Sequence, residues 1–263
     1  MSSYSLLADL KSYLNITTST DDVLLQVMLD AATSRIDAET QRTFQAASDT
    51  VRYFDPTEDV CGGKLELDCN LSYITSVLNG DGSNITTDII TNPRNATPYY
   101  SLQIKGTAGT VWAYTDDYEN SIVITGRWAW MERQAITALS RSAGSVVTAT
   151  VTAPRVCVGA SVFVTGVADS TFNGTFTVVS NSGAAITWAQ SGTVDTDTTG
   201  VLLFTPTDIV MACRRFSSWL YRQKDTQMGD IDRPVMTGDG VMIMPTTLPN
   251  DVTRLLAPYR NPL

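Results

Sequence analysis

The sequence contains no histidine, and its charged residues are few and mostly acidic. Its 263 residues include 18 Lys and Arg against 27 Asp and Glu, which gives a net charge of −9. Without histidine there is no Ser-His-Asp or Cys-His nucleophile pair, no imidazole acid or base and no histidine metal ligand. The acidic balance also disfavours general nucleic-acid affinity, which needs a basic surface to neutralise phosphates. Carboxylate and lysine chemistry are not excluded.

Cysteine is scarce as well, and long apolar runs are missing. The four cysteines stand at positions 61, 69, 157 and 213 without a Cys-x2-Cys pair, so we expect free thiols and no metal site. A Cys61–Cys69 disulfide is the alternative, because these residues flank a predicted strand. No basic, apolar leader begins the sequence, and no stretch approaches the ~20 apolar residues of a membrane span.

Two helices are predicted at the N-terminus. Leu6, Leu7, Leu10 and Leu14 recur at helical spacing over residues 5–14. A second helix is expected from about residue 20 to 43, with Ser19 and Asp22 as its capping box. Its expected apolar stripe consists of Leu24, Val27, Met28, Ala31 and Ile36. These two helices are expected to pack as a hairpin.

Short strands are predicted over residues 51–126. Leu65 and Leu67 alternate with polar residues, and the run 74–78 leads into an Asn-Gly-Asp-Gly turn. Residues 100–104 alternate in the same way, and the run Ile122-Val-Ile-Thr ends at Gly126. The expected structure is a small antiparallel β meander.

Residues 134–204 differ in composition from the rest of the chain. They contain no Lys or Glu, and their charged residues are Arg141, Arg155, Asp169, Asp195 and Asp197. Valine alternates with small polar residues, which indicates a compact all-β barrel or sandwich of five or six strands. A disordered linker is the alternative, but strand and turn residues alternate too regularly for one.

The best helix start in the sequence is Thr205-Pro-Thr-Asp208. Thr205 is expected to cap the helix, with Pro206 at its first position. Arg214, Arg215, Arg222 and Lys224 follow toward its C-terminal end, where the helix dipole accounts for them better than contact with DNA. The final segment carries Leu255, Leu256 and Tyr259 between prolines. An extended arm with apolar anchors and a segment packed on its own domain are both open interpretations.

Motifs that carry chemistry are largely missing. No phosphate-binding Gly-x4-Gly-Lys-Ser/Thr and no Gly-x-Gly-x-x-Gly after a strand occurs. The pairs Asp195/Asp197 and Asp230/Asp232 lack the Gly and distal Glu of a calcium loop. We therefore expect no enzyme, no cofactor and no metal.

The order of several weak motifs resembles a known family. They are Asp9-Leu-Lys with Leu14, Ala31-Ala-x-x-Arg-Ile-Asp37, Arg42-x-Phe44, Ile122-x-Ile-Thr-Gly-x-Trp128, Pro206-x-Asp-Ile209 with Ala212, Trp219-Leu-Tyr-Arg222, and the tail 248–260. This order resembles the head–tail connector, or adaptor, proteins of long-tailed bacteriophages. In that family the Gly-x-Trp strand runs almost directly into the Pro-x-Asp-Ile helix, whereas here residues 134–204 intervene. The insert resembles a β module of phage structural proteins.

The resemblance implies an α+β fold. The adaptor core would comprise residues 1–133 and 205–263, with 228–263 as an extended C-terminal arm and 134–204 as an inserted β domain. A long insertion in a surface loop costs little entropy. Such adaptors form rings of about twelve subunits on the portal vertex, between the portal and the next neck or tail-completion protein.

The resemblance also implies how this chain would work. DNA would pass through the ring without specific binding, and an acidic channel wall would let it slide. The C-terminal arm would bind the portal protein through Leu255, Leu256, Pro258, Tyr259 and Arg260. The protein would be made in the host cytoplasm, take part in genome packaging and reside in the neck of the virion, with no membrane partner.

Two other functions fit parts of the sequence. A glycan-binding or adhesion protein of the virion surface is suggested by the Thr-rich β module with Trp188. A virion-associated glycan hydrolase would use two of the many carboxylates. The connector interpretation is the leading hypothesis, because it alone accounts for the order of motifs along both flanks of the insert.

Overall fold

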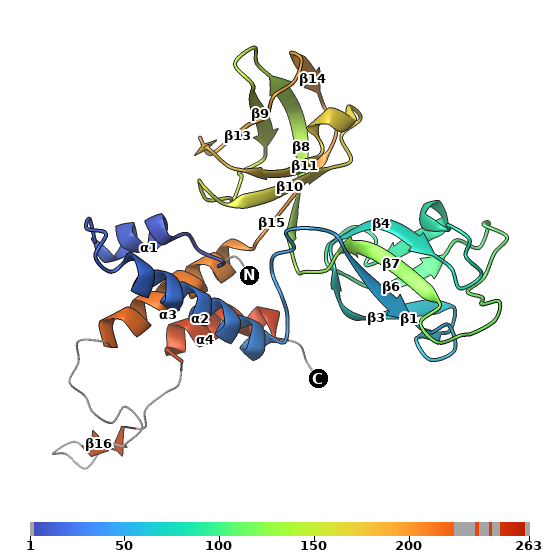
Figure 1. Ribbon diagram of the computed structural model, residues 1–263, viewed down its shortest axis with the longest axis horizontal. Coiled ribbons are helices and arrows are strands. Elements are labelled where there is room, and N and C mark those ends of the chain that lie inside the picture. The colour runs from blue at the N-terminus through green and yellow to red at the C-terminus, as the bar shows by residue number, and fades with distance from the viewer. Residues whose placement is uncertain (1–2, 224–234, 237–241, 244–247, 261–263) are drawn as a thin grey trace. The chain divides into compact units, whose positions relative to one another are not determined.

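The computed structural model describes residues 3–223, 235–236, 242–243 and 248–260 (Figure 1). Two compact units make up the chain. Unit 1 comprises Met1–Gln41 and Thr207–Leu263, and unit 2 comprises Arg42–Pro206. Helices and antiparallel sheets are both present, so the class is α+β as predicted. Unit 2 contains both the predicted strand region 42–133 and the predicted insert 134–204, and the division into an adaptor core and an inserted domain stays a prediction.

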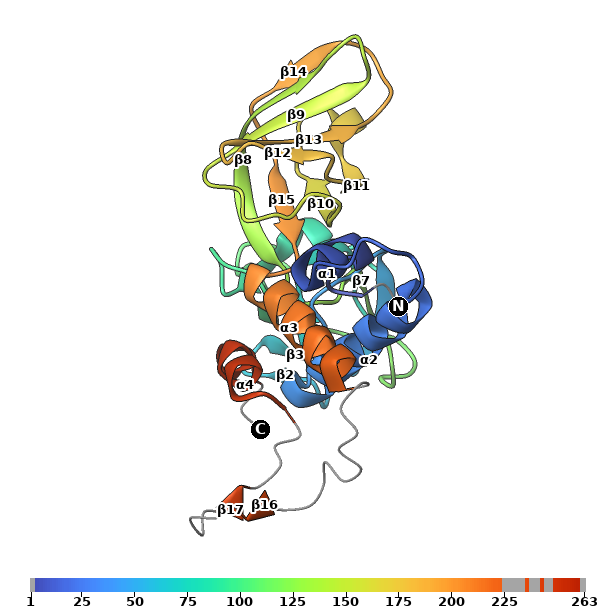
Figure 2. The same cartoon turned by 90° about the vertical axis from the view of Figure 1, so that its left-hand side faces the viewer.

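Unit 1 is helical. Its helices are α1 (Leu7–Leu14), α2 (Asp22–Thr40), α3 (Thr207–Gln223) and α4 (Asn250–Leu256), followed by the 3-10 turn η3 (Ala257–Tyr259). Helices α1 and α2 each end at a residue in the left-handed conformation, Asn15 and Gln41. Helix α3 packs against α1, α2 and α4 (Figure 2). A short antiparallel pair, β16 (Val235–Met236) with β17 (Met242–Ile243), precedes α4.

The details at the helix starts differ from the prediction. Helix α2 has Asp21 as its N-cap residue, with no capping bond from its side chain, so the Ser19 capping box is wrong. The Thr205 hydroxyl donates to the carbonyl oxygen of Phe44, 3.1 Å away, and thereby anchors the chain just before α3. The buried residues of α2 are Leu25, Leu29, Ala32, Thr33, Ile36 and Thr40. Of the predicted stripe, Leu24, Val27 and Ala31 are exposed instead.

The first part of unit 2 contains two small sheets around one core. One sheet has the order β1-β7-β4, formed by Thr50–Phe54, Ile122–Arg127 and Tyr73–Leu78. The other has the order β2-β3-β6-β5, formed by Val60–Cys61, Lys64–Leu71, Tyr99–Ile104 and Ile89–Asn92, with the turn η1 (Thr86–Asp88) before β5. A simple meander is therefore wrong, because β1 pairs with the distant β7. The core includes Phe54, Leu65, Ile124 and Trp128.

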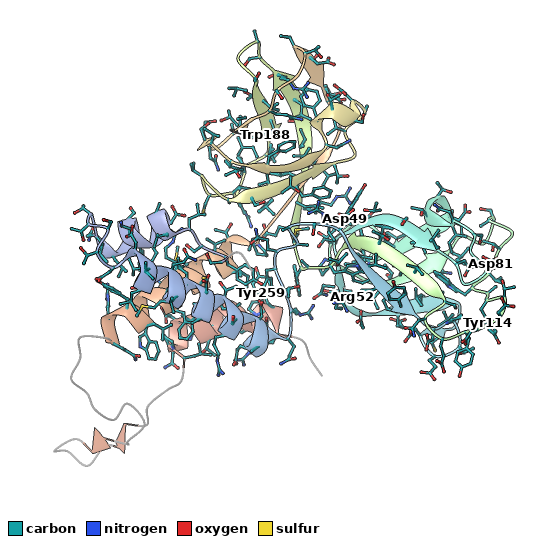
Figure 3. All side chains as sticks on the ribbon, viewed as in Figure 1. Asp49, Arg52, Asp81, Tyr114, Trp188 and Tyr259 are labelled. Carbon is teal, nitrogen blue, oxygen red and sulfur yellow. The ribbon has the colours of Figure 1, made fainter. Side chains whose placement is uncertain are left out.

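The second part of unit 2 is one curled sheet of eight strands, more than the five or six predicted. Its members are β8 (Glu132–Arg141), β9 (Val146–Val151), β10 (Ser161–Thr165), β11 (Gly174–Thr177), β12 (Ser180–Asn181), β13 (Ala185–Ala189), β14 (Asp195–Asp197) and β15 (Val201–Phe204), with η2 (Ser170–Phe172) before β11. The long strand β8 pairs with β15, β14 and β9. The alternating apolar residues form a separate core that includes Phe172. Trp188 lies within it (Figure 3). We call residues 132–204 the β module.

Aromatic and cation–π contacts join the two parts of unit 2. The rings of Tyr73 and Phe163 meet edge to face at 5.2 Å, and the Arg127 guanidinium lies 4.1 Å from the Phe163 ring centre. Arg127 also pairs with Asp49 at 2.5 Å and donates to the Ala46 carbonyl. The β module therefore covers one end of the β1-β7-β4 sheet.

Candidate interaction surfaces

The five C-terminal residues predicted to bind a portal protein do not form an extended arm. Residues 250–259 are helical, as α4 and η3, and pack on α3. Most of residues 228–247, the first part of the predicted arm, lie outside the described residues. Pro258 stands at the start of η3, where its missing N–H costs nothing.

The predicted anchors divide into two groups. Leu256 is fully buried and Tyr259 is buried, together with Val252 and Leu248. Leu255 is half-buried, while Pro258 and Arg260 are exposed. Burying the first pair stabilises unit 1, so the side chains nearest an outside partner are those of Leu255, Pro258 and Arg260, of which Arg260 also pairs with Glu39 of α2.

Ion pairs account for two of the basic residues predicted on and near α3. Arg214 Nη2 lies 2.8 Å from Asp9 of α1, and Arg215 Nη1 lies 2.6 Å from Asp251 of α4. Arg222 is exposed, and Lys224 is outside the described residues. The arrangement indicates that Arg214 and Arg215 join helices and are not a phosphate-binding patch.

Sequence reasoning missed a second apolar face on α2. Val23 is 81% exposed and Val27 is 59% exposed, and Leu24 beside them is exposed as well. Ala31 and Ala38 continue the exposed face toward the end of the helix. The available signal was an excess of apolar residues: positions 23–25 and 27–29 are all apolar, which is more than one buried stripe requires.

The outer face of the β1-β7-β4 sheet was missed as well. Val51 and Tyr53 of β1 are exposed, as is Leu78 of β4. The cross-strand register places Tyr53, Val123 and Leu78 in one row and Val51, Thr125 and Ser76 in the next. This face carries no charge over two rows, although strands with one free face normally present polar residues there.

Three loops of unit 2 gather acidic residues. Asn79 of the loop 79–84 donates to the Val111 carbonyl at 2.9 Å and accepts from the Ala113 N–H at 3.2 Å. The Asn120 N–H donates to the Asp55 carboxylate. Together the ranges 55–60, 79–84 and 110–120 contain no Lys or Arg and seven acids: Asp55, Glu58, Asp59, Asp81, Asp116, Asp117 and Glu119.

These acidic loops form a negative surface, not a cation cage. Hydrogen bonds from the Ser83 hydroxyl and N–H hold the pKa of Asp81 below its ordinary value. Over the parts of the chain that the structure describes, no group of three Cys, Asp or Glu side chains is placed to hold a metal ion. The surface repels phosphate and attracts basic groups.

The predicted acidic pair of the β module has a structural role. Asp197 accepts from the Thr199 hydroxyl at 2.6 Å and from the N–H groups of Asp169, Thr198 and Thr199, which lowers its pKa to about 2. Asp195 pairs in register with Arg141, whose side chain is buried over the Phe172 ring at 4.1 Å. These contacts hold the loop ends of the module together. Asp230 and Asp232 lie outside the described residues.

Trp188 was the aromatic residue that suggested glycan binding. It is fully buried in the core of the β module and stacks on Phe176 with ring centres 5.3 Å apart. A buried ring offers no stacking platform to a sugar, so the observation behind the glycan hypothesis is lost.

The thiols are free, as the sequence predicted. All four cysteines are unpaired, so the alternative Cys61–Cys69 disulfide is not formed. Burial raises the pKa of Cys69 to about 12, although the positive charge of nearby Arg52 acts to lower it. Burial likewise raises the pKa of Cys213. Neither thiol is an activated nucleophile.

One cleft of unit 2 is open to solvent. It has a volume of about 520 Å³ and is lined by Asn95, Thr97, Arg133, Gln134 and Arg155, among others. Its lining has no nucleophile activated by a neighbouring base. No helix among the described residues is long and apolar enough to cross a membrane.

Taken together, apolar faces left open on a helix and on a sheet, a docked C-terminal helix and acidic loops describe a protein whose surfaces are built for contact with other proteins. The class is therefore that of an assembly protein. Residues 4–77 match the sequence model of the phage gp6-like head-tail connector proteins. No curated protein matches the chain.

The family match confirms the resemblance to phage head–tail connectors. It spans α1, α2, β1 to β3 and nearly all of β4, and it ends before the β module. The match supports a phage head–tail structural protein, a place in the virion and contacts with other head and tail proteins. Members of this family are structural proteins and not enzymes.

Proposed function

We propose that the chain is the subunit of a ring that joins the portal to the tail side of the neck and continues the DNA channel. The observation that carries the proposal is the connector match over residues 4–77, combined with apolar faces that stay open on both units. Open apolar faces on a folded chain are typical of a protein that assembles. The ring of about twelve subunits follows from the family resemblance.

The C-terminal segment is the proposed portal contact, as the helix α4 and the turn η3 and not as an extended arm. Leu256 and Tyr259 would hold α4 and η3 on the helical unit, and Leu255, Pro258 and Arg260 would present the outward surface to the portal. The same five residues are thus divided between support and contact. Tail-side contacts would be made to the next neck or tail-completion protein.

The acidic composition supports passage of DNA without binding. With a net charge of −9 per chain, a ring of identical copies repels phosphate, so DNA is expected to slide through it. We also propose that the β module is an insertion. Glu132 of β8 and Phe204 of β15 are direct cross-strand partners, so the module leaves and rejoins the chain at one point. A body of ~70 residues fits the outer rim better than the channel.

Electron microscopy of the purified protein, alone and mixed with its portal, tests the proposal. Closed rings with a central channel, seated coaxially on the portal, are the expected result. Negative-stain images and mass measurements on the same samples give the subunit number. A strict monomer that ignores the portal at micromolar concentration would overturn the proposed function.

A further inference from the structure

The exposed face of α2 is a narrow uncharged stripe. At 100° per residue, Val23, Val27, Ala31, Ser34 and Ala38 lie on one side of the helix, and all five are exposed. Leu24 adjoins them, and the nearest charges, Asp30 and Arg35, flank the stripe. Small residues at 31, 34 and 38 allow close approach of another backbone. From Val23 to Ala38 the stripe is about 22 Å long.

The exposed face of the β1-β7-β4 sheet is the matching flat surface. Its two open rows, Tyr53-Val123-Leu78 and Val51-Thr125-Ser76, contain no charge, and Tyr53 is 59% exposed. The next row, with Tyr73 and Arg127, is already covered by Phe163 of the β module. The two open rows span about 7 Å along the strands and about 10 Å across the three strands, so they can receive the middle of the α2 stripe.

The net charge argues that the occupant of both faces is a second copy of the chain. Two copies at −9 each repel one another, so a contact between surfaces without acidic groups avoids adding to that repulsion. The acidic loops 55–60, 79–84 and 110–120 are unsuited to such a contact. The α2 stripe and the open sheet rows are both apolar and uncharged, and a helix laid on a sheet face is a standard way to bury each.

We propose that the α2 stripe of one copy docks on the open β1-β7-β4 rows of the next copy. This inference rests on the proposed ring and assigns its subunit contact. A ring requires a head-to-tail contact between two different surfaces, because a self-complementary surface closes at a dimer. Two distinct open faces, one on each unit of the chain, meet that requirement. Val27 and Tyr53 are the central side chains of this contact.

Single lysine substitutions test each face. Val27→Lys places a charge in the helix stripe, and Tyr53→Lys places one in the sheet rows. The matched controls are Val179→Lys and Tyr100→Lys, which change exposed residues elsewhere, Val179 being 60% exposed against 59% for Val27. Burying an unpaired charge opposes association, so the concentration for half assembly should rise roughly a hundredfold for the first two variants. The controls should assemble like wild type.

Mixing the two defective variants gives the decisive measurement. The Val27→Lys chain keeps an intact sheet face, and the Tyr53→Lys chain keeps an intact helix stripe. One good junction therefore forms between them and cannot be extended. Native mass spectrometry should show monomers of each variant alone and a 1:1 heterodimer on mixing. Circular dichroism melting of each variant checks that the fold is retained.

The outcomes separate this inference from the proposed function. A wild-type chain that never forms rings contradicts the proposed function itself. If wild type forms rings and a folded Val27→Lys or Tyr53→Lys chain also forms intact rings, the inference alone is overturned. If a variant keeps its rings but loses portal binding, the face that it changes contacts the portal instead. Homodimers of a single variant, or no heterodimer on mixing, show that the contact is not head-to-tail between these faces.

Discussion

The guanidinium of Arg260, just after η3, forms an ion pair with the carboxylate of Glu39 on α2. A second pair, Arg215 with Asp251 at 2.6 Å, holds the start of α4 on α3. The segment 250–260 is therefore fastened to the helical unit at both ends, with Leu256 buried between. In this arrangement the C-terminal segment is a part of the fold that also presents a surface.

Leu256 and Leu255 should separate these two roles. Leu256→Ala removes a fully buried side chain and should lower the free energy of unfolding by about 2–5 kcal/mol, measured in urea. Leu255→Ala changes the half-buried neighbour and should lower the free energy of unfolding by much less than Leu256→Ala. It should nevertheless weaken binding to purified portal. A Leu255→Ala chain that binds portal with wild-type affinity would contradict the proposed contact.

Trp188 should behave as a core residue of the β module. Trp188→Ala should cost about 3–5 kcal/mol of stability, because the ring is fully buried and stacked on Phe176. Differential scanning calorimetry should show a lower melting temperature for the module. Trp188→Phe, which keeps an aromatic ring in the core, is the control and should lose much less. Equal stability of the Ala variant would contradict this packing.

The hydrogen bonds to Asp197 predict that the β module loses stability in acid. Since its pKa in the folded chain is about 2, below the ordinary 3.8, the ionised carboxylate is the form that the fold stabilises. Its contribution is fully present above about pH 5 and is lost as the pH falls from about 4 to 2. Asp197→Asn should therefore lower the melting temperature at pH 7 but match wild type near pH 2. Asp116→Asn, with the same change of charge on an exposed loop, is the control.

The thiols predict an order of alkylation. Cys61 is exposed and should react first with iodoacetamide at pH 8. Mass spectrometry of the peptide that contains each cysteine measures the extent of alkylation. Cys69 and Cys213 should react far more slowly, because burial raises both pKa values and leaves almost no thiolate. In urea all should react at similar rates. Rapid modification of Cys213 in the folded chain would contradict its burial.

Local patterns predicted the helices better than their buried faces. Helix α2 was expected from its spacing and is present, but Leu24 and Leu25 are adjacent and equally apolar. Which of them is buried depends on where α3 packs, which no local pattern contains. Similarly, the strand at Ile122–Arg127 was expected, but its pairing with β1 joins residues far apart in sequence. The resulting open sheet face could not be predicted.

The C-terminal segment shows the opposite difficulty. Prolines at 249 and 258 made residues 250–257 look unsuited to a helix. Pro249 precedes α4 as its N-cap residue, and Pro258 stands at the start of η3, so neither breaks a helical hydrogen bond. The sequence did mark Leu256 and Tyr259 as apolar anchors. It left open whether they anchor to this chain, and the fold of unit 1 supplies that partner.

Replacing residues 134–204 with a short Gly/Ser linker tests whether the β module is an insertion. The cut ends, Arg133 and Thr205, are the chain neighbours of the cross-strand partners Glu132 and Phe204, so they lie close together and a short linker can close the gap. The module's core shares no residue with the core around Trp128, and a small cluster of Leu203 with Ala129 and Met131 lies between them, so each core should fold without the other. The shortened chain should therefore remain folded and still form rings.

The deletion should nevertheless carry a measurable cost. It removes Phe163 from the Tyr73 ring and from the Arg127 guanidinium, and the Thr175 hydroxyl from Arg127. The ring and cation–π contacts together are worth about 1–3 kcal/mol, so urea unfolding should shift by that amount. Arg127 keeps its ion pair with Asp49, which limits the loss. A shortened chain that fails to fold would show that the module is part of the core, whereas an unchanged free energy of unfolding would show that the Phe163 contacts contribute nothing.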